Sequence, residues 1–373
     1  MVPWLPEKLP SPLVPAWSAP LNHRALAGIA VAGGVVVVAD RDLFDKEDVF
    51  HCYDAATGLP KWAVRYAANG KLDYGPSARA TPLIDGERVF TLSAFGDLHC
   101  LRRNDGKVLW KKNLLDEYGG ELTAWGMCSS PLVVDGKLIV NPGGPQASLV
   151  ALRPETGEEL WRCPGARHAF ASFIVGEFGG RRQLVGYDAI SLGGWDPATG
   201  RRLWRITPDI EGDFNVPTPI AYRGQALVAT ENNGARLYGF DREGGAGPQP
   251  LATHADLAPD TSTPVILDDR VFGVWGGTLF CLNAADGLEP LWTGRDRALH
   301  DYASLIASPA HGGRVIIATL KGELLLLDAA AHEMQMVSRA RAFEGGESMS
   351  HPAVAGKRIY LRSPNAVTCF GAD

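Results

Sequence analysis

The stretch DAATGLPKW, residues 54–62, places a tryptophan four residues after a turn glycine. Similar stretches return as NDGKVLW (104–110), ETGEELW (155–161), DPATGRRLW (196–204) and, with one extra residue, DGLEPLW (286–292). Trp62, Trp110, Trp161 and Trp204 are 48, 51 and 43 residues apart, and Trp292 follows after 88, which is two steps of 44. A period of this length predicts a repeat architecture.

Further copies of the pattern complete the series. Residues 240–249 keep the Asp and the turn glycine but place Gln249 in the tryptophan position, and residues 326–336 place Met336 there. The last copy, 367–373, stops where its outer strand should begin. Trp17, 45 residues before Trp62, can supply that strand from the other end of the chain. The sequence therefore predicts eight units.

Two other signals recur in phase with the tryptophans. Six units open with a Ser, Thr or His followed by Pro, as in Thr81-Pro82. The strand before each Asp–Gly turn carries a small apolar residue followed by a large one, as in Cys100-Leu101. Successive strand residues face opposite sides of a sheet, so neighbouring apolar positions mean that both faces are buried. Small four-stranded sheets packed face to face around an axis satisfy this pattern.

We therefore predict an all-β fold: an eight-bladed β-propeller of four-stranded antiparallel blades in a single domain, residues 1–373. Residues 1–12 are expected to form an extended arm because they are rich in proline. Residues 13–20 are expected to pair with the C-terminal blade and close the ring, which would remove exposed sheet edges. In this arrangement each tryptophan packs on the next blade as a spacer.

Composition restricts the partners. The net charge of −6 and the pI near 5.9, without any Lys/Arg run, argue against a nucleic-acid partner. The most apolar run, residues 26–39, is too short for a membrane span and is interrupted by Gly33-Gly34. We expect a monomer. It is expected to be periplasmic or otherwise extracytoplasmic if a signal peptide was removed, and cytoplasmic otherwise.

The phased turn with its tryptophan and the Ser/Thr-Pro strand openings resemble the repeats of the pyrroloquinoline-quinone (PQQ) propeller superfamily. That superfamily includes quinoprotein alcohol dehydrogenases and outer-membrane assembly factors of the BamB type. Segments such as FGDLHCLRRNDGKVLWKKNL (residues 95–114) look most like uncharacterised BamB-like members. The resemblance implies the propeller fold along nearly the whole chain, whereas function in such folds depends on individual loops.

The chain departs from the enzymes of that superfamily. They use PQQ with Ca²⁺, a catalytic Asp and commonly a disulfide between adjacent cysteines, but no Cys-Cys pair occurs here. Four of the six cysteines, Cys52, Cys100, Cys281 and Cys369, share one repeat position, which is typical of a small buried hydrophobe. A bond between Cys128 and Cys163 stays open. We expect no cofactor, with PQQ and calcium as the less favoured alternative.

Candidate binding residues lie in the segments before each Ser/Thr-Pro pair, because in a propeller these loops meet at one mouth of the central channel. Trp125 is foremost since it is out of phase with the structural tryptophans. The nine candidates are His23, Arg24, Arg79, Trp125, His168, Asn215, Asp260, His300 and His351. His168, His300 and His351 could converge on a metal, although unrelated surface histidines fit their spacing better.

The leading hypothesis is a non-enzymatic binding or scaffold propeller of the bacterial cell envelope, with a protein or small-molecule partner at the channel mouth. The alternative is a PQQ- or metal-dependent quinoprotein oxidoreductase of the alcohol dehydrogenase type. A third hypothesis is a sensor module cut from a longer polypeptide.

Overall fold

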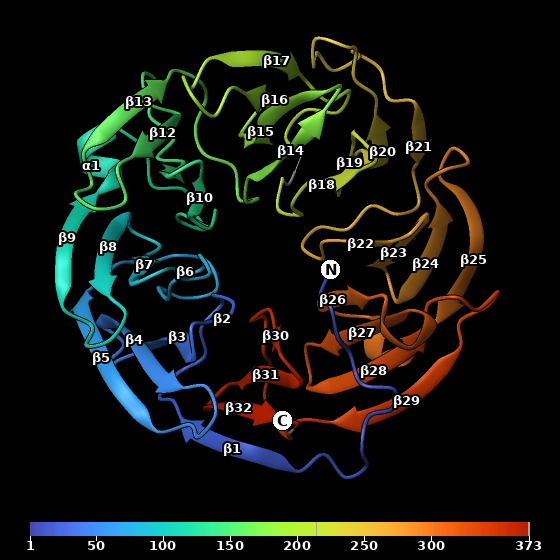
Figure 1. Ribbon diagram of the computed structural model, residues 1–373, viewed down its shortest axis with the longest axis horizontal. Coiled ribbons are helices and arrows are strands. Elements are labelled where there is room, and N and C mark those ends of the chain that lie inside the picture. The colour runs from blue at the N-terminus through green and yellow to red at the C-terminus, as the bar shows by residue number, and fades with distance from the viewer. Residues whose placement is uncertain (214, 372–373) are drawn as a thin grey trace.

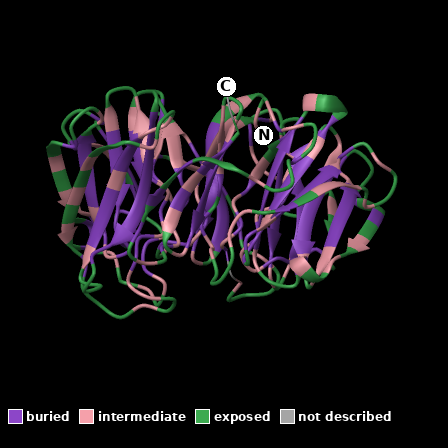
Figure 2. Ribbon diagram, turned by 90° about the horizontal axis from the view of Figure 1, so that it is seen from below, coloured by how far each residue is buried: buried purple, intermediate pink, exposed green. Residues whose placement is uncertain are grey.

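The computed structural model describes residues 1–373 apart from 214 and 372–373. Eight four-stranded antiparallel sheets form a ring (Figure 1), so the predicted eight-bladed propeller is confirmed. We number the blades 1 to 8 along the chain and call the strands of a blade a to d from the axis outward. Figure 2 shows buried residues running along the strands and exposed residues gathered in the loops at both faces of the ring.

Short strands build every blade, in the order a, b, c, d along the chain for blades 1 to 7. Blade 1 contains β2 (Ala30–Ala32), β3 (Val35–Arg41), β4 (Glu47–Asp54) and β5 (Pro60–Ala67), and blade 2 contains β6 (Leu83–Asp85), β7 (Arg88–Leu92), β8 (Asp97–Arg102) and β9 (Val108–Asn113). Blade 3 contains β10 (Leu132–Val134), β11 (Lys137–Val140), β12 (Leu149–Leu152) and β13 (Glu159–Cys163), and blade 4 contains β14 (Ile174–Phe178), β15 (Arg181–Asp188), β16 (Ser191–Trp195) and β17 (Arg202–Ile206).

The second half of the ring repeats this order. Blade 5 contains β18 (Ile220–Tyr222), β19 (Gln225–Thr230), β20 (Gly234–Tyr238) and β21 (Ala252–His254). Blade 6 contains β22 (Val265–Leu267), β23 (Arg270–Trp275), β24 (Thr278–Asn283) and β25 (Glu289–Arg295). Blade 7 contains β26 (Ala303–Ser308), β27 (Arg314–Thr319), β28 (Glu323–Asp328) and β29 (Met336–Arg341). Helical structure in the described chain is limited to α1 (Leu114–Tyr118), η1 (Arg297–Leu299) and η2 (Ala310–Gly312).

Blade 8 closes the ring with both ends of the chain. It contains β30 (Ala353–Ala355), β31 (Arg358–Ser363) and β32 (Ala366–Phe370), and its outermost strand is β1 (Pro15–Pro20). Strand β1 pairs antiparallel with β32, from Pro15 opposite Phe370 to Pro20 opposite Ala366. The predicted closure is therefore present, and blade 8 has its outer strand like the other seven.

The tryptophans connect neighbouring blades through the turn glycines. The indole Nε1 of Trp110 donates to the carbonyl of Pro154 at 2.9 Å, and the ring covers Gly157 so closely that a Cβ there would lie 2.8 Å from it. Trp62 covers Gly106 of blade 2 in the same way. At the closure, Trp17 of β1 donates to Ala55 at 3.1 Å and covers Gly58 of blade 1. The constant offset between glycine and tryptophan follows from this contact.

The small residue on strand c is explained by its position opposite the tryptophan. Cys100 faces Trp110 across the β8–β9 pair, Cys52 faces Trp62, and a register shift follows directly after each of them. Both cysteines are fully buried. A larger side chain would collide with the indole that lies beside it.

Trp204 departs from the pattern. Its Nε1 donates to the side chain of Gln183 at 2.7 Å, and Gln183 in turn donates to the carbonyl of Gly244 in blade 5 at 3.0 Å. The hydrogen-bonded link to the next blade therefore passes through a glutamine, while the ring itself meets Phe240 of blade 5 edge-on at 5.5 Å between centroids.

The first twelve residues pack on the ring. Leu5 and Leu9 are buried in an apolar cluster with blades 7 and 8. The backbone amide of Val2 donates to Ala307 at 2.9 Å, and that of Leu9 to the Ser338 hydroxyl at 2.8 Å. Figure 1 shows this segment crossing from the rim to an N-terminus inside the ring.

Candidate functional site

Topology brings one set of loops from every blade to the same face. Strands alternate in direction, so the loops from strand d to the next strand a end at the face that also carries the turns between strands b and c. We call this the mouth face. At its centre lies a cavity of about 720 Å³, lined by residues that all eight blades contribute or that directly precede them in the chain.

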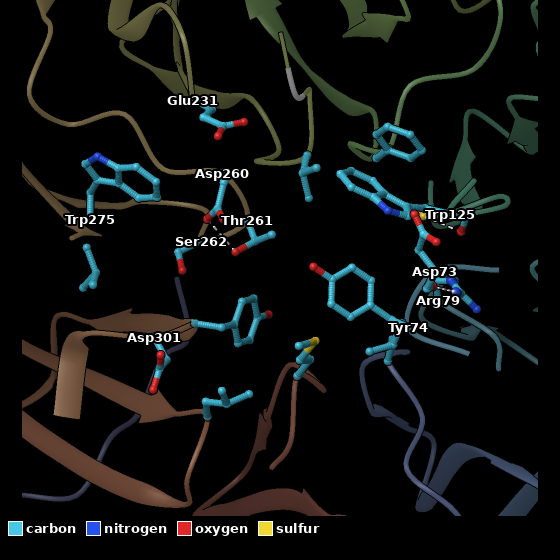
Figure 3. A pocket seen from close by; sticks show the side chains of 18 of the residues that line it. Asp73, Tyr74, Arg79, Trp125, Glu231, Asp260, Thr261, Ser262, Trp275 and Asp301 are labelled. Atoms are coloured by element: carbon cyan, nitrogen blue, oxygen red, sulfur yellow. Dashed lines mark hydrogen bonds between the residues drawn. The ribbon is translucent and has the colours of Figure 1, made fainter. Parts of the chain in front are cut away.

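Aromatic rings form much of the cavity wall (Figure 3). Trp125 lies 4.7 Å from Phe170 and 6.5 Å from Tyr74, measured between ring centroids. Trp275 stands on the opposite side of the cavity. Tyr302 completes the set. Rings of this kind offer flat apolar surfaces and negatively polarised faces to a ligand.

Four carboxylates line the same cavity. They belong to Asp73, Glu231, Asp260 and Asp301. Burial raises the pKa of Glu231, and the neighbouring charges of Asp260 and Asp213 raise it further. The Oε2 atom of Glu231 is inaccessible to solvent and has no hydrogen-bond partner in the described chain. Within that part of the chain, this carboxylate oxygen therefore lacks a compensating donor.

Arg79 contributes the guanidinium of the cavity. Its Nη2 donates to the backbone carbonyls of Asp73 at 2.7 Å and Gly75 at 2.6 Å, and its Nη1 donates to that of Ser77. The side chain thus fixes the loop between β5 and β6. Because Nη1 and Nη2 of Arg79 donate to carbonyls of its own loop, this guanidinium does not pair with the carboxylates of Glu231, Asp260 and Asp301 across the cavity.

A series of hydrogen bonds holds the loops beneath the mouth along part of the ring. In four places the backbone amide of a strand-opening residue donates to a hydroxyl in the next blade, a role of the Ser/Thr-Pro positions that the repeat pattern alone does not reveal. The pairs are Thr81 with Ser130 (3.0 Å), Ser130 with Ser172 (3.0 Å), Ser172 with Thr218 (3.4 Å) and Thr218 with Thr263 (3.1 Å). Ser262 accepts from Ala303 at 3.2 Å. The loops are therefore tied together from blade 2 to blade 7.

Four of the nine residues proposed from the sequence line the cavity: Arg79, Trp125, Asp260 and His300. Arg24 lines a separate hollow of about 540 Å³ above blades 7 and 8, together with Lys321 and Arg341. His351 is exposed, and its Nδ1 lies 3.0 Å from the carbonyl of Pro352.

Three of the nine hold loops in place. His168 is 2% exposed, with Nε2 3.3 Å from the Thr123 hydroxyl, and burial lowers its pKa. Asn215 is buried and donates to the carbonyl of Asp188 at 3.4 Å. The amide of His23 donates to Asp40 at 3.0 Å, while its carbonyl accepts from Arg362. These contacts place the three residues in the packing between neighbouring segments.

The described part of the chain contains no group of three or more His, Cys, Asp or Glu side chains that could hold a metal ion. The three histidines considered as metal ligands therefore do not converge. No disulfide joins any of the six cysteines, so Cys128 and Cys163 are not bonded to each other.

Several cavity residues escaped the sequence reasoning because they lie on turns between strands b and c. Glu231 follows β19, Trp275 ends β23 and Leu320 follows β27. The alternation of strand direction could have found them, since it places these turns on the mouth face. Phe170 precedes β14, two residues after the predicted His168.

Comparisons with known proteins agree with this architecture. The family model described as outer membrane protein assembly factor BamB matches residues 68–293 and again 145–373. Quinoprotein alcohol dehydrogenase PedH of Pseudomonas putida is 33% identical over 119 residues, which cover 30% of this chain and 19% of that protein. Quinoprotein ethanol dehydrogenase of Pseudomonas aeruginosa is 28% identical over 198 residues, or 48% of this chain and 28% of that protein. The chain spans less than a third of the length of either relative.

A solved structure extends the likeness to the whole ring. Quinohemoprotein alcohol dehydrogenase from Comamonas testosteroni aligns over 96% of this chain and 76% of its own, with a TM-score of 0.66 and 14% identity, which speaks for the fold alone. Among the described residues no helix is long and apolar enough to cross a membrane. Repeats, ring and family match agree: the chain belongs to the family of the outer membrane protein assembly factor BamB, within the PQQ-like β-propeller superfamily.

Proposed function

We propose that this chain is a non-enzymatic binding or scaffold module of the bacterial cell envelope, which takes a protein segment or a small ligand at its mouth. The observation that carries the proposal is the cavity of about 720 Å³ with aromatic walls and four carboxylates. Its volume lies within the ~300–1,000 Å³ of ordinary ligand sites, and its few polar groups among apolar walls are typical of them. The family model is described as an outer membrane protein assembly factor, and this description supports a protein partner and an extracytoplasmic location for the chain.

The cavity does not fit PQQ and calcium. PQQ is a polycarboxylate and therefore an anion, whereas the lining carries four carboxylates against the guanidinium of Arg79. Carboxylates that share one site repel one another and a further anion unless a cation lies between them. The described residues offer no cluster of three metal-binding side chains to hold such a cation. We therefore derive no redox step for this site.

The alternative function, a quinoprotein oxidoreductase, is favoured by one observation, the local identity to two quinoprotein dehydrogenases. A titration separates the two functions. The purified protein is mixed with PQQ and CaCl₂, and bound-quinone absorbance and dye-linked ethanol oxidation are measured. We expect neither signal. Dye reduction above that of heat-denatured protein would replace the proposed function with the alternative.

A positive test uses the mouth itself. A fragment library of mixed charge is screened by ligand-observed NMR against the wild type, Trp125→Ala and Asp260→Asn. Glu243→Gln is the matched control, since Glu243 is exposed in the turn between β20 and β21 at the opposite face. Fragments should bind the wild type and the control but lose saturation transfer with the mouth variants. Hits that are insensitive to both mouth substitutions would contradict the proposal.

A further inference from the structure

The cavity wall formed by blades 5 to 7 combines negative charge with an aromatic surface. Glu231, Asp260 and Asp301 lie on the same side as Trp275 (Figure 3). Asp301 is 3.6 Å from Lys321 in an exposed pair, which is weak in water. The Asp260 carboxylate accepts from the Thr261 hydroxyl at 2.9 Å, which leaves its charge in place. This wall is therefore acidic as well as aromatic.

Glu231 is a partly buried carboxylate of this wall. Its Oε2 is enclosed and lacks a hydrogen bond among the described residues. A buried carboxylate oxygen without a partner is costly, and a neighbouring carboxylate adds repulsion. Hydrogen-bond donors that carry positive charge would satisfy both demands at once.

The aromatic rings select the kind of cation. Trp275 lies on the same side of the cavity as these carboxylates, and Tyr74 reaches into the cavity from the opposite side (Figure 3). Alkylammonium and guanidinium groups are attracted to the faces of Trp and Tyr rings by cation–π interaction, whereas a hydrated metal ion prefers several convergent oxygen ligands. Such a set of metal ligands is absent from the described chain.

We infer that the mouth binds an organic cation, an alkylammonium or guanidinium group, between Trp275 and the carboxylates of Glu231 and Asp260. The inference rests on the proposed binding function and specifies its ligand. The group can belong to a free amine or to a Lys or Arg side chain of a partner. The cavity encloses the cationic end, and the rest of the ligand leaves through the open mouth.

Isothermal titration calorimetry with butylguanidinium, its neutral isostere butylurea and a capped Gly-Arg-Gly peptide tests the inference. We expect butylguanidinium or the peptide to bind at least about tenfold more tightly than butylurea, as charge-assisted hydrogen bonds and cation–π contacts require. Binding by the peptide alone identifies a basic side chain of a partner as the source. Binding by both admits a free small-molecule cation.

Variants locate the cation. Glu231→Gln and Trp275→Leu should each weaken binding about tenfold, while Glu243→Gln should leave it unchanged; melting curves verify that each variant is folded. Equal affinity for butylurea, indifference to Glu231→Gln, or no heat with either cation overturns the inference. A neutral glycoside or citrate that binds in a Trp275-dependent manner also overturns it but leaves the proposed function standing. Dye-linked oxidation with PQQ and calcium would remove that function itself.

Discussion

Substituting Gly157 by alanine tests the contact between a tryptophan and the glycine of the next blade. Gly157 has a φ of +72°, so an alanine there incurs the left-handed penalty of about 1–2 kcal/mol. Its Cβ would also lie 2.8 Å from the Trp110 ring, well inside an ordinary carbon–carbon contact of roughly 3.5 Å. Forcing the ring aside should add about 1–3 kcal/mol to the loss of stability.

Gly136 provides a matched control. It has a φ of +71°, but nothing lies within 4 Å of the position that a Cβ would take there. Gly136→Ala should therefore lose only the backbone penalty of about 1–2 kcal/mol. The unfolded chain changes equally in both variants, so the difference of about 1–3 kcal/mol measures the collision with the indole.

A double mutant completes the design. In a Trp110→Ala background the ring is gone, so Gly157→Ala should cost no more than Gly136→Ala does in the wild type. Urea unfolding followed by far-UV circular dichroism, with calorimetry to check the number of transitions, gives these free energies. Equal losses for Gly157→Ala and Gly136→Ala in the wild-type background would refute the blade-to-blade contact.

Further predictions concern separate parts of the molecule. Trp125→Ala should remove a ring contact with Phe170 worth about 0.5–1.5 kcal/mol, whereas Trp110→Ala should cost about 2–4 kcal/mol, less than a fully buried tryptophan because the ring is partly exposed; variants that melt alike would disprove the distinction between the two tryptophans. Leu5→Ala should lose about 2–5 kcal/mol in urea unfolding because the side chain is fully buried, while the exposed Leu43→Ala should change stability by less than about 0.5 kcal/mol; equal effects would show that the first twelve residues are not packed. Burial lowers the pKa of His168, so the unfolded chain binds its proton first as the pH falls, and stability should decline below a pH of about 6.5. Melting temperatures from pH 8 to 5 should decline less steeply for His168→Gln, and an unchanged slope would show that His168 does not cause the loss.

The fold could be predicted because its main contact leaves a periodic trace. Trp62 of blade 1 touches Gly106 of blade 2, and Trp110 of blade 2 touches Gly157 of blade 3, so both residue types recur in phase along the chain. The cysteine opposite each of these indoles explains the alternation of small and large residues. Trp204 shows the limit of the pattern, since its link through Gln183 depends on a residue outside the repeat.

The site could be predicted only in part. Arg79, Trp125, Asp260 and His300 line the cavity because the loops before strand a meet at the axis. Asn215 belongs to the same class of loop but is buried, because irregular segments also pack between blades and no periodic pattern shows which side chains turn inward.

Glu231 was missed for a different reason. It lies on a turn between two strands of one blade, and only the relative direction of the strands places that turn at the mouth.

The central claim is a closed ring whose eight blades share one mouth, and its most direct test joins the two ends of the chain. Ser18 and Thr368 are paired across β1 and β32, and their hydroxyl oxygens lie 3.0 Å apart although 350 positions separate them in sequence. The double variant Ser18→Cys, Thr368→Cys should form this disulfide within one chain under mild oxidation. Non-reducing electrophoresis should show a faster monomer, and mass spectrometry should find the linked peptides. Free thiols at both positions, or linkage only between chains, would contradict the closed ring.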